Sequence, residues 1–171
     1  WSVIVTAKTR AQRKRLRPIR QGGKEYYAMI VSSEQERDLV LDPTYQTIVS
    51  RAAERGQSNP LFKNAIAVVQ GVIIYSHNKV FNTLGLGSGS RWGAGGTIHG
   101  AQAQLFGAQA AGLATLGNMF MRESDNTDYG NRPGIGVGRK IGMLKPQFKS
   151  IVDGNTLEDF GTIAVKTAAA A

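Results

Sequence analysis

The sequence predicts an α+β protein, and three observations support this fold class. Apolar residues recur with helical spacing in some segments and alternate or run continuously in others, in mixed order. The hydrophobic fraction of 42% is close to that of ordinary globular domains. A length of 171 residues suits one domain with a single core. We expect a helix end and basic connector over residues 1–24, followed by one globular α+β unit over residues 25–171.

The opening residues predict the end of an amphipathic helix. Apolar residues between Trp1 and Ala11 share roughly one helical face. Pro18 cannot continue a helix, because its ring removes a backbone donor and clashes with the preceding turn. The pair Gly22-Gly23 then predicts a turn.

A buried strand is predicted next, over Glu25–Ser33, where the residues are aromatic and β-branched. Ser32 or Ser33 is placed to cap the following helix, with a glutamate or glutamine nearby to complete a capping box. That helix is expected to end at Asp42.

A second helix is predicted over Pro43–Gly56, where the proline suits the first helical position and the glycine suits the C-terminal stop. The apolar segment Ala65–His77 is divided by Gly71, and its second piece, Val72–Tyr75, is the strongest strand prediction in the chain. A long glycine-rich loop follows over Asn78–His99. Loops of this length in a compact domain are usually functional or disordered.

The C-terminal half predicts mostly extended structure. Strands are expected over Ala101–Phe106, Met119–Ser124 and Gly161–Thr167. The small residues of Gly107–Gly117 predict a helix or turn that packs closely. Gly130–Leu144 is rich in glycine but carries apolar residues at alternate positions, which suits a strand or extended segment.

No pattern indicates an enzyme. His77 and His99 are separated by the glycine-rich loop and form no i, i+4 pair. The glycines of Gly85–Gly89 are followed by more glycine and not by a helix, so they lack the context of a dinucleotide loop. Gly138–Lys140 lacks the hydroxyl residue of a phosphate-binding P-loop. We therefore predict no catalytic residue, no metal and no cofactor.

The sequence also predicts no membrane association. Its longest apolar run, Ala65–Tyr75, is broken by Gln70 and Gly71 and is shorter than the ~20 residues of a membrane helix. We expect no signal peptide, because the chain opens with Trp1 and a basic segment. Cysteine is absent, which excludes disulfides and thiolate metal sites.

Nearly all the excess positive charge lies in one segment, Ala7–Lys24. It holds eight basic residues and no acidic one, whereas the rest of the chain holds 13 basic and 12 acidic residues (21 − 8 = 13). Clustered Lys and Arg suit phosphate binding, but no aromatic residue interleaves with them to stack on bases. Two interpretations stay open: a nucleic-acid contact, and a surface or subunit contact. The candidate residues are Arg13, Lys14, Arg15, Arg17 and Arg20.

Five segments, taken in order, resemble a known family. They are RPIRQGGKEYYAMIVSSEQERDL, ERGQSNPLFKNAIAVVQGVIIYSHNKVF, HGAQAQLFGAQAAGLA, DYGNRPGIGVGRKIGMLKPQF and DFGTIAVKTA. As a set they resemble the C-terminal part of the major capsid proteins of tailed phages, in the family of phages related to coliphage N-four. The resemblance covers roughly residues 17–168.

This resemblance implies the Hong Kong 97-type capsid fold, with most of the axial domain and part of the peripheral domain. Members of the family also have an N-terminal arm, an extended hairpin loop and most of a long spine helix before this region. The segment Trp1–Arg13 is therefore expected to be the remnant of an element that precedes the axial domain.

The function implied by the resemblance is that of a structural subunit, which self-assembles into hexamers and pentamers of an icosahedral shell enclosing the DNA genome. Such a protein is located in the virion and is assembled in the host cytoplasm. Its partners are other copies of itself, with packaged double-stranded DNA, portal, decoration and scaffold proteins as further candidates. The expected subunit-contact loop contains Leu84, Arg91 and Trp92. The alternative function is a nucleic-acid-binding module that uses the basic run.

Overall fold

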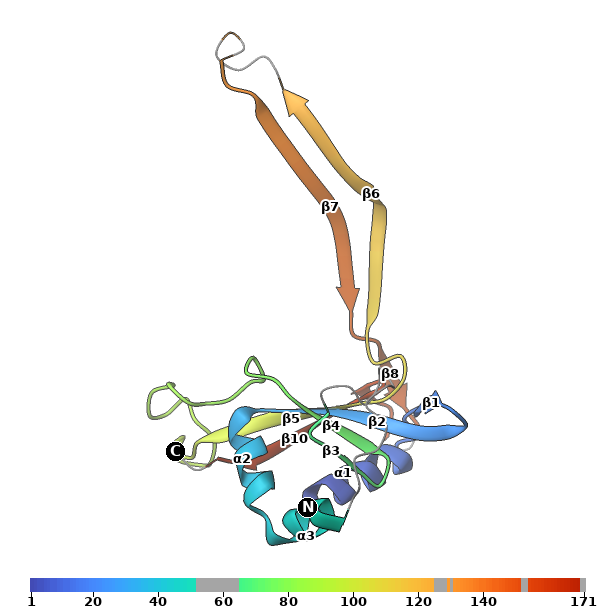
Figure 1. The fold of residues 1–171 in the computed structure, drawn as a ribbon, viewed down its shortest axis with the longest axis vertical. Coiled ribbons are helices and arrows are strands. Elements are labelled where there is room, and N and C mark those ends of the chain that lie inside the picture. Colours follow the sequence, from blue (N-terminus) through green and yellow to red (C-terminus); the bar gives the residue numbers. More distant parts are fainter. Residues whose placement is uncertain (52–64, 125–128, 130, 152–153, 170–171) are drawn as a thin grey trace.

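The computed structural model describes residues 1–51, 65–124, 129, 131–151 and 154–169. These residues form a body of sheet and helices, from which a long two-stranded ribbon extends (Figure 1). The predicted helix over Pro43–Gly56 is described as far as Arg51, and its predicted stop at Gly56 lies outside the described residues.

The body is organised around a six-stranded mixed sheet. Its strand order is β10-β5-β2-β4-β3, and β1 pairs with the beginning of β2. Neighbouring strands are antiparallel, except that β2 and β4 are parallel. The strands are β1 (Ile19–Gln21), β2 (Lys24–Val31), β3 (Ala67–Val69), β4 (Val72–Ser76), β5 (Gly100–Phe106) and β10 (Thr162–Ala168).

The turn between β1 and β2 is the predicted Gly22-Gly23 pair. Both glycines have positive φ, at 57° and 76°. A two-residue hairpin turn of this kind requires positive φ at both central positions, and glycine adopts it without steric cost. The turn is confirmed, although the sequence did not predict the short strand β1 before it.

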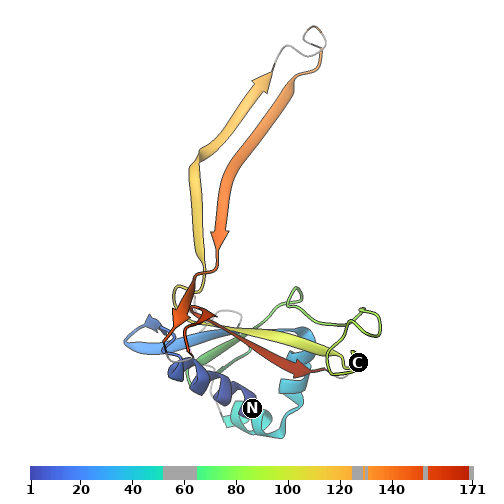
Figure 2. The same ribbon diagram turned by 180° about the vertical axis from the view of Figure 1, so that it is seen from behind.

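The core lies where helix α1 (Ser2–Arg13) packs beneath the central strands, as both ribbon views show (Figure 2). On α1 the buried residues are Ile4, Ala7 and Ala11, at a spacing that places them on one helical face. On the sheet, Ile74 and Leu105 are fully buried in the same cluster. Small alanines on α1 let the helix backbone approach the sheet closely. The predicted amphipathic helix is confirmed.

Helices α2 (Ser33–Leu41) and α3 (Pro43–Arg51) follow β2. Of the two candidate serines, Ser32 is the cap: its Oγ accepts a hydrogen bond from the Gln35 backbone N–H (3.3 Å), while Gln35 Oε1 accepts from the Ser32 N–H (3.2 Å). The Gln35 side chain also donates to the Ala101 carbonyl (3.2 Å) and to Thr167 Oγ1 (2.7 Å). One buried glutamine therefore joins α2 to both β5 and β10.

The ribbon consists of β6 (Gly112–Ser124) and β7 (Gly134–Leu144), paired antiparallel. The predicted helix or turn over Gly107–Gly117 is thus wrong from Gly112 onward, where the chain is strand. Alanine favours a helix, but three glycines in this segment each cost about 1 kcal/mol in a helix, and β7 supplies backbone partners instead. Between the pairs Leu116/Lys140 and Phe120/Gly138 the register shifts, and Gly117 has a φ of 72°.

A smaller hairpin, β8 (Gln147–Ser150) with β9 (Thr156–Asp159), lies at the base of the ribbon (Figure 1). The sequence did not predict it. Lys145 Nζ and Gln147 Nε2 each donate to the Asp159 carboxylate at 2.8 Å. These hydrogen bonds, first that of Gln147 and then that of Lys145, hold the pKa of Asp159 below its ordinary value.

The other strand predictions agree with the structure. The strands predicted at Glu25, Val72, Ala101, Met119 and Gly161 are found as β2, β4, β5, β6 and β10, and the extended segment before Leu144 is β7. The strand predicted over Glu25–Ser33 ends at Val31, because Ser32 caps α2. The division of the chain at residue 24 stays a prediction, and helix α1 shares one core with the sheet.

We predict that Gln35→Ala lowers the free energy of unfolding by about 1–3 kcal/mol, because it removes half of the capping box and leaves buried polar groups on two strands without their partner. Chemical denaturation of the purified protein measures this loss. Gln46→Ala is the matched control: the Gln46 side chain is exposed and donates to the Val40 carbonyl, so its loss is expected to stay below about 0.5 kcal/mol. Equal losses in the two variants would contradict the proposed role of Gln35.

Candidate interaction surfaces

The basic segment Ala7–Lys24 is attached to the rest of the body by its own charges. Lys8 Nζ donates to the Gln70 carbonyl. Lys14 Nζ forms a 2.5 Å ion pair with Glu158 of β9. Arg17 donates to Gln109 Oε1 (3.2 Å), and Arg20 pairs with Glu25 across the β1–β2 hairpin (3.0 Å). Three of the five candidate basic residues, Lys14, Arg17 and Arg20, thus have partners within the chain.

Three other arginines of the segment point to solvent. Arg10, Arg13 and Arg15 are exposed, and none of their guanidinium groups has a hydrogen bond or ion pair with a described residue. Arg10 and Arg13 lie in the last turn of α1, and Arg15 follows the helix directly. We call these three residues the arginine cluster. Sequence reasoning had selected Arg13 and Arg15 but not Arg10.

The backbone fixes where Arg15 lies. The Arg15 N–H donates to the Gln12 carbonyl (3.0 Å) and the Leu16 N–H donates to the Ala11 carbonyl (3.0 Å). These are the two bonds of a Schellman helix end, whose turning residue has positive φ and is usually glycine. Here that residue is Arg15, with a φ of 55°. Leu16 is buried, and its carbonyl accepts a 3.1 Å bond from the hydroxyl of Tyr27, whose pKa is raised chiefly by burial.

The loop Asn78–His99 is anchored on the sheet through Trp92. The Trp92 ring packs directly on Gly100, where an added Cβ would lie 2.1 Å from the ring. Lys166 Nζ lies 5.6 Å from the centroid of the same ring, within the range of a cation–π interaction. Trp92 and Ile98 pair backbone to backbone, and Arg91 Nε donates to the Leu86 carbonyl (2.9 Å). Of the predicted contact residues, Leu84, Arg91 and Trp92 are all partly buried.

The ribbon carries a third surface, which sequence reasoning did not select. Paired residues of an antiparallel ribbon point to the same side, and successive residues alternate. The register therefore places one set of apolar side chains together. We call this side the apolar face; it holds Leu113, Met121, Ile135, Val137, Ile141 and Met143, with Thr115, Glu123 and Arg139 among them. Each of the six apolar residues is more than half exposed.

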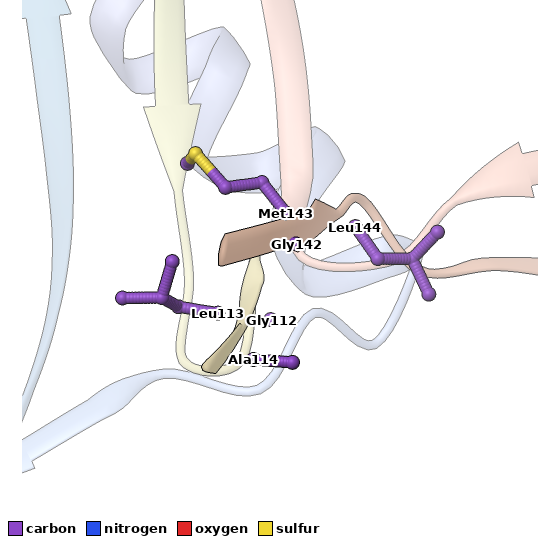
Figure 3. Close-up of a pocket in the computed structure, with 6 residues that line it drawn as sticks. All are labelled: Gly112, Leu113, Ala114, Gly142, Met143 and Leu144. Atoms are coloured by element: carbon purple, nitrogen blue, oxygen red, sulfur yellow. The ribbon is translucent and has the colours of Figure 1, made fainter. Parts of the chain in front are cut away.

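The opposite side of the ribbon is shaped by glycine. On β7 it presents Gly134, Gly136, Gly138 and Gly142. Phe120 lies across from Gly138, where an added Cβ would be 2.4 Å from the phenyl ring. At the base of the ribbon, six residues line a shallow hollow, and Leu113 and Met143 extend to one side of it while Leu144 extends to the other (Figure 3). In the sequence, the alternation Gly-Ile-Gly-Val-Gly at residues 134–138 is the pattern that indicates a strand with glycine on one side and apolar residues on the other.

No metal-binding cluster is found among the described residues. They contain no group of three or more His, Cys, Asp or Glu side chains that could hold a metal ion. His77 Nδ1 accepts a hydrogen bond from the Lys79 N–H (3.1 Å), which is a structural role. Within the described residues, none of the helices has the length and apolarity that a membrane span requires.

Comparisons with known proteins identify the family of this chain. A family model described as "Phage capsid protein" matches residues 3–171. The chain belongs to this phage capsid protein family. It is 39% identical to the major capsid protein of Pseudomonas phage KPP25 over 170 residues, which is 99% of this chain and 45% of that protein. The chain therefore spans less than half the length of this relative.

Solved capsids share the fold. The capsid of Ralstonia phage GP4 superimposes with a TM-score of 0.66 at 27% identity, covering 91% of this chain and 40% of that one. The acid-stable capsid of Helicobacter pylori bacteriophage KHP30 gives a TM-score of 0.60 at 18% identity, covering 90% and 50% of the two chains. The predicted α+β, Hong Kong 97-type phage capsid fold is confirmed. The comparisons give no support to a stand-alone nucleic-acid-binding module.

We predict that Gly100→Ala displaces Trp92 from the sheet of this capsid protein, because the new methyl group would occupy the position of the indole ring. In a Trp1→Phe background, Trp92 is the remaining tryptophan. Its fluorescence emission should shift to longer wavelength and become more accessible to acrylamide. Gly87→Ala is the control, since an added Cβ there meets nothing within 4 Å. Unchanged emission in Gly100→Ala would contradict this packing.

Proposed function

We propose that this chain is part of a structural subunit that self-assembles into the hexamers and pentamers of an icosahedral phage shell enclosing the DNA genome. The subunit has no catalytic role and uses no cofactor. It resides in the virion after assembly in the host cytoplasm. Portal, decoration and scaffold proteins are its further candidate partners, and the body and ribbon correspond to the axial domain and part of the peripheral domain.

The exposed ribbon of β6 and β7 is the observation that supports this proposal. A two-stranded ribbon alone is marginally stable in water, and its two faces have no third layer to cover them. Contiguous exposed apolar rows of this kind mark interaction surfaces. The ribbon extends well away from the body (Figure 1), so its outer half, with Met121, Ile135 and Val137, lies where another copy can pack against it. Repeated copies that make the same contact around an axis produce a closed assembly.

We predict that Ile135→Lys prevents the complete subunit from forming shells, because the ammonium group would be buried at the contact between copies. Sedimentation and negative-stain microscopy measure shell formation. Ile135 pairs with Glu123 across the ribbon, so the substitution adds a favourable cross-strand pair and should not harm the ribbon itself.

Leu41→Lys is the matched control. Leu41 and Ile135 are both 64% exposed, and a lysine at the end of α2 is favourable to the helix. We expect normal shells from Leu41→Lys. If Ile135→Lys instead lowers the melting temperature of the unassembled subunit, the ribbon is covered within its own subunit and this contact between copies is excluded.

We also propose that the loop over residues 84–96 contacts neighbouring subunits at a symmetry axis. The loop is anchored on the sheet by Trp92, while its tip residues from Gly85 to Ser90 are exposed. A firmly held base with an exposed tip suits a contact repeated around an axis.

We predict that deleting the exposed tip residues 87–90, which keeps the Trp92 anchor, leaves the subunit folded but reduces shells to incomplete particles, as seen by electron microscopy. The melting temperature of the unassembled subunit is the control, because the deleted residues contribute little to the core. Normal shells from the deletion variant would rule out the axis contact.

A further inference from the structure

We propose that the arginine cluster, Arg10, Arg13 and Arg15, binds the phosphate backbone of double-stranded DNA. The inference rests on the proposed function, in which the subunit encloses DNA, and it assigns one surface of the subunit to that partner. The basic residues of the segment that have partners within the chain hold the segment in place. They take no part in this contact.

Charge complementarity favours a partner outside the chain. Among the described residues, four of the eight carboxylates have cationic side-chain partners: Glu25, Asp38, Glu158 and Asp159 pair with Arg20, Arg37, Lys14 and Lys145. Of the other four, Glu34 has a buried carboxylate oxygen. A second copy of the described surface thus offers few free carboxylates to meet three arginines. DNA presents a continuous row of phosphates, and displacing their counterions favours binding by clustered cations.

The helix end adds an independent observation. The negative end of the α1 dipole is by itself a sufficient explanation for Arg10 and Arg13. Arg15 cannot be explained in this way, since it occupies the left-handed position of the Schellman motif, where glycine would fold with less strain. The buried Leu16 and the Tyr27 hydroxyl bond hold that position in place. A strained residue maintained by its surroundings is a sign of a functional side chain.

The chemistry of the cluster specifies how the DNA is bound. All three residues are arginines, whose planar guanidinium groups match phosphate oxygens in a bidentate manner. No residue between Ala7 and Lys24 is aromatic, so the segment has no ring to stack on bases. The contact should therefore be independent of base sequence and strongly dependent on salt.

The test compares two triple variants of the complete, unassembled subunit. Fluorescence anisotropy measures binding of a duplex of about 30 base pairs in about 50 to 300 mM NaCl. In Arg10→Gln/Arg13→Gln/Arg15→Gln, the slope of log affinity against log salt should fall by about 2.7, or about 0.9 for each lost phosphate contact. The control Lys79→Gln/Lys140→Gln/Lys149→Gln removes the same charge from other exposed sites and should keep the slope. Equal slopes in the two variants would overturn the proposal.

The single variant Arg15→Gly separates binding from folding. Because glycine suits the left-handed position, the melting temperature should stay equal or rise by a few degrees. The salt slope should nevertheless fall by about 0.9. A lower melting temperature with an unchanged slope would assign Arg15 a structural role and overturn its part in the contact.

Assembly of the triple variant distinguishes this inference from the proposed function. We expect normal empty shells that retain DNA poorly. Loss of shells in the absence of DNA would show that the cluster contacts an acidic neighbour, and it would overturn the DNA contact while leaving the function as a shell subunit intact.

Discussion

The packing of α1 against the central strands is the contact on which the other features depend. Ile4, Ala7 and Ala11 of α1 are buried in one cluster with apolar residues of β2, β4 and β5. That contact determines the direction in which the helix ends. It thereby positions the Schellman turn, the arginine cluster and the first hairpin of the sheet, so the predicted helix end and basic connector are a fixed part of the body.

The ribbon differs from the body in leaving its apolar residues exposed. The body buries its apolar residues within one chain, whereas β6 and β7 place theirs where no described residue covers them. Glycines on β7 allow one side of the ribbon to be flat and to receive the Phe120 ring. A strand pair without a third layer is marginally stable alone, which is in keeping with the proposal that copies of the subunit share stability through this ribbon.

Local signals in the sequence were sufficient for much of the body. Ser32 with Gln35, Pro43 at a helix start, and the apolar run at Val72 each depend on neighbours within a few residues, so their patterns predict the element directly. The helix or turn expected from Gly107 onward failed because β6 is stabilised by β7, more than ten residues further along the chain. For the same reason, the partner of Lys14, which lies 144 residues away, could not be predicted from the sequence.

The basic residues of the segment Ala7–Lys24 fall into two groups. One group of cations, exemplified by Lys14 and Arg17, joins the connector to distant segments and makes the body rigid. The other group, the arginine cluster, stays in solvent on that rigid support. A charge held at a fixed position costs less entropy to bind than one on a flexible arm, because its backbone is already ordered. In the proposed contact, internal pairing of some cations prepares the remaining ones for an external polyanion. Under that proposal, the basic run combines residues that hold the body together with residues that bind DNA.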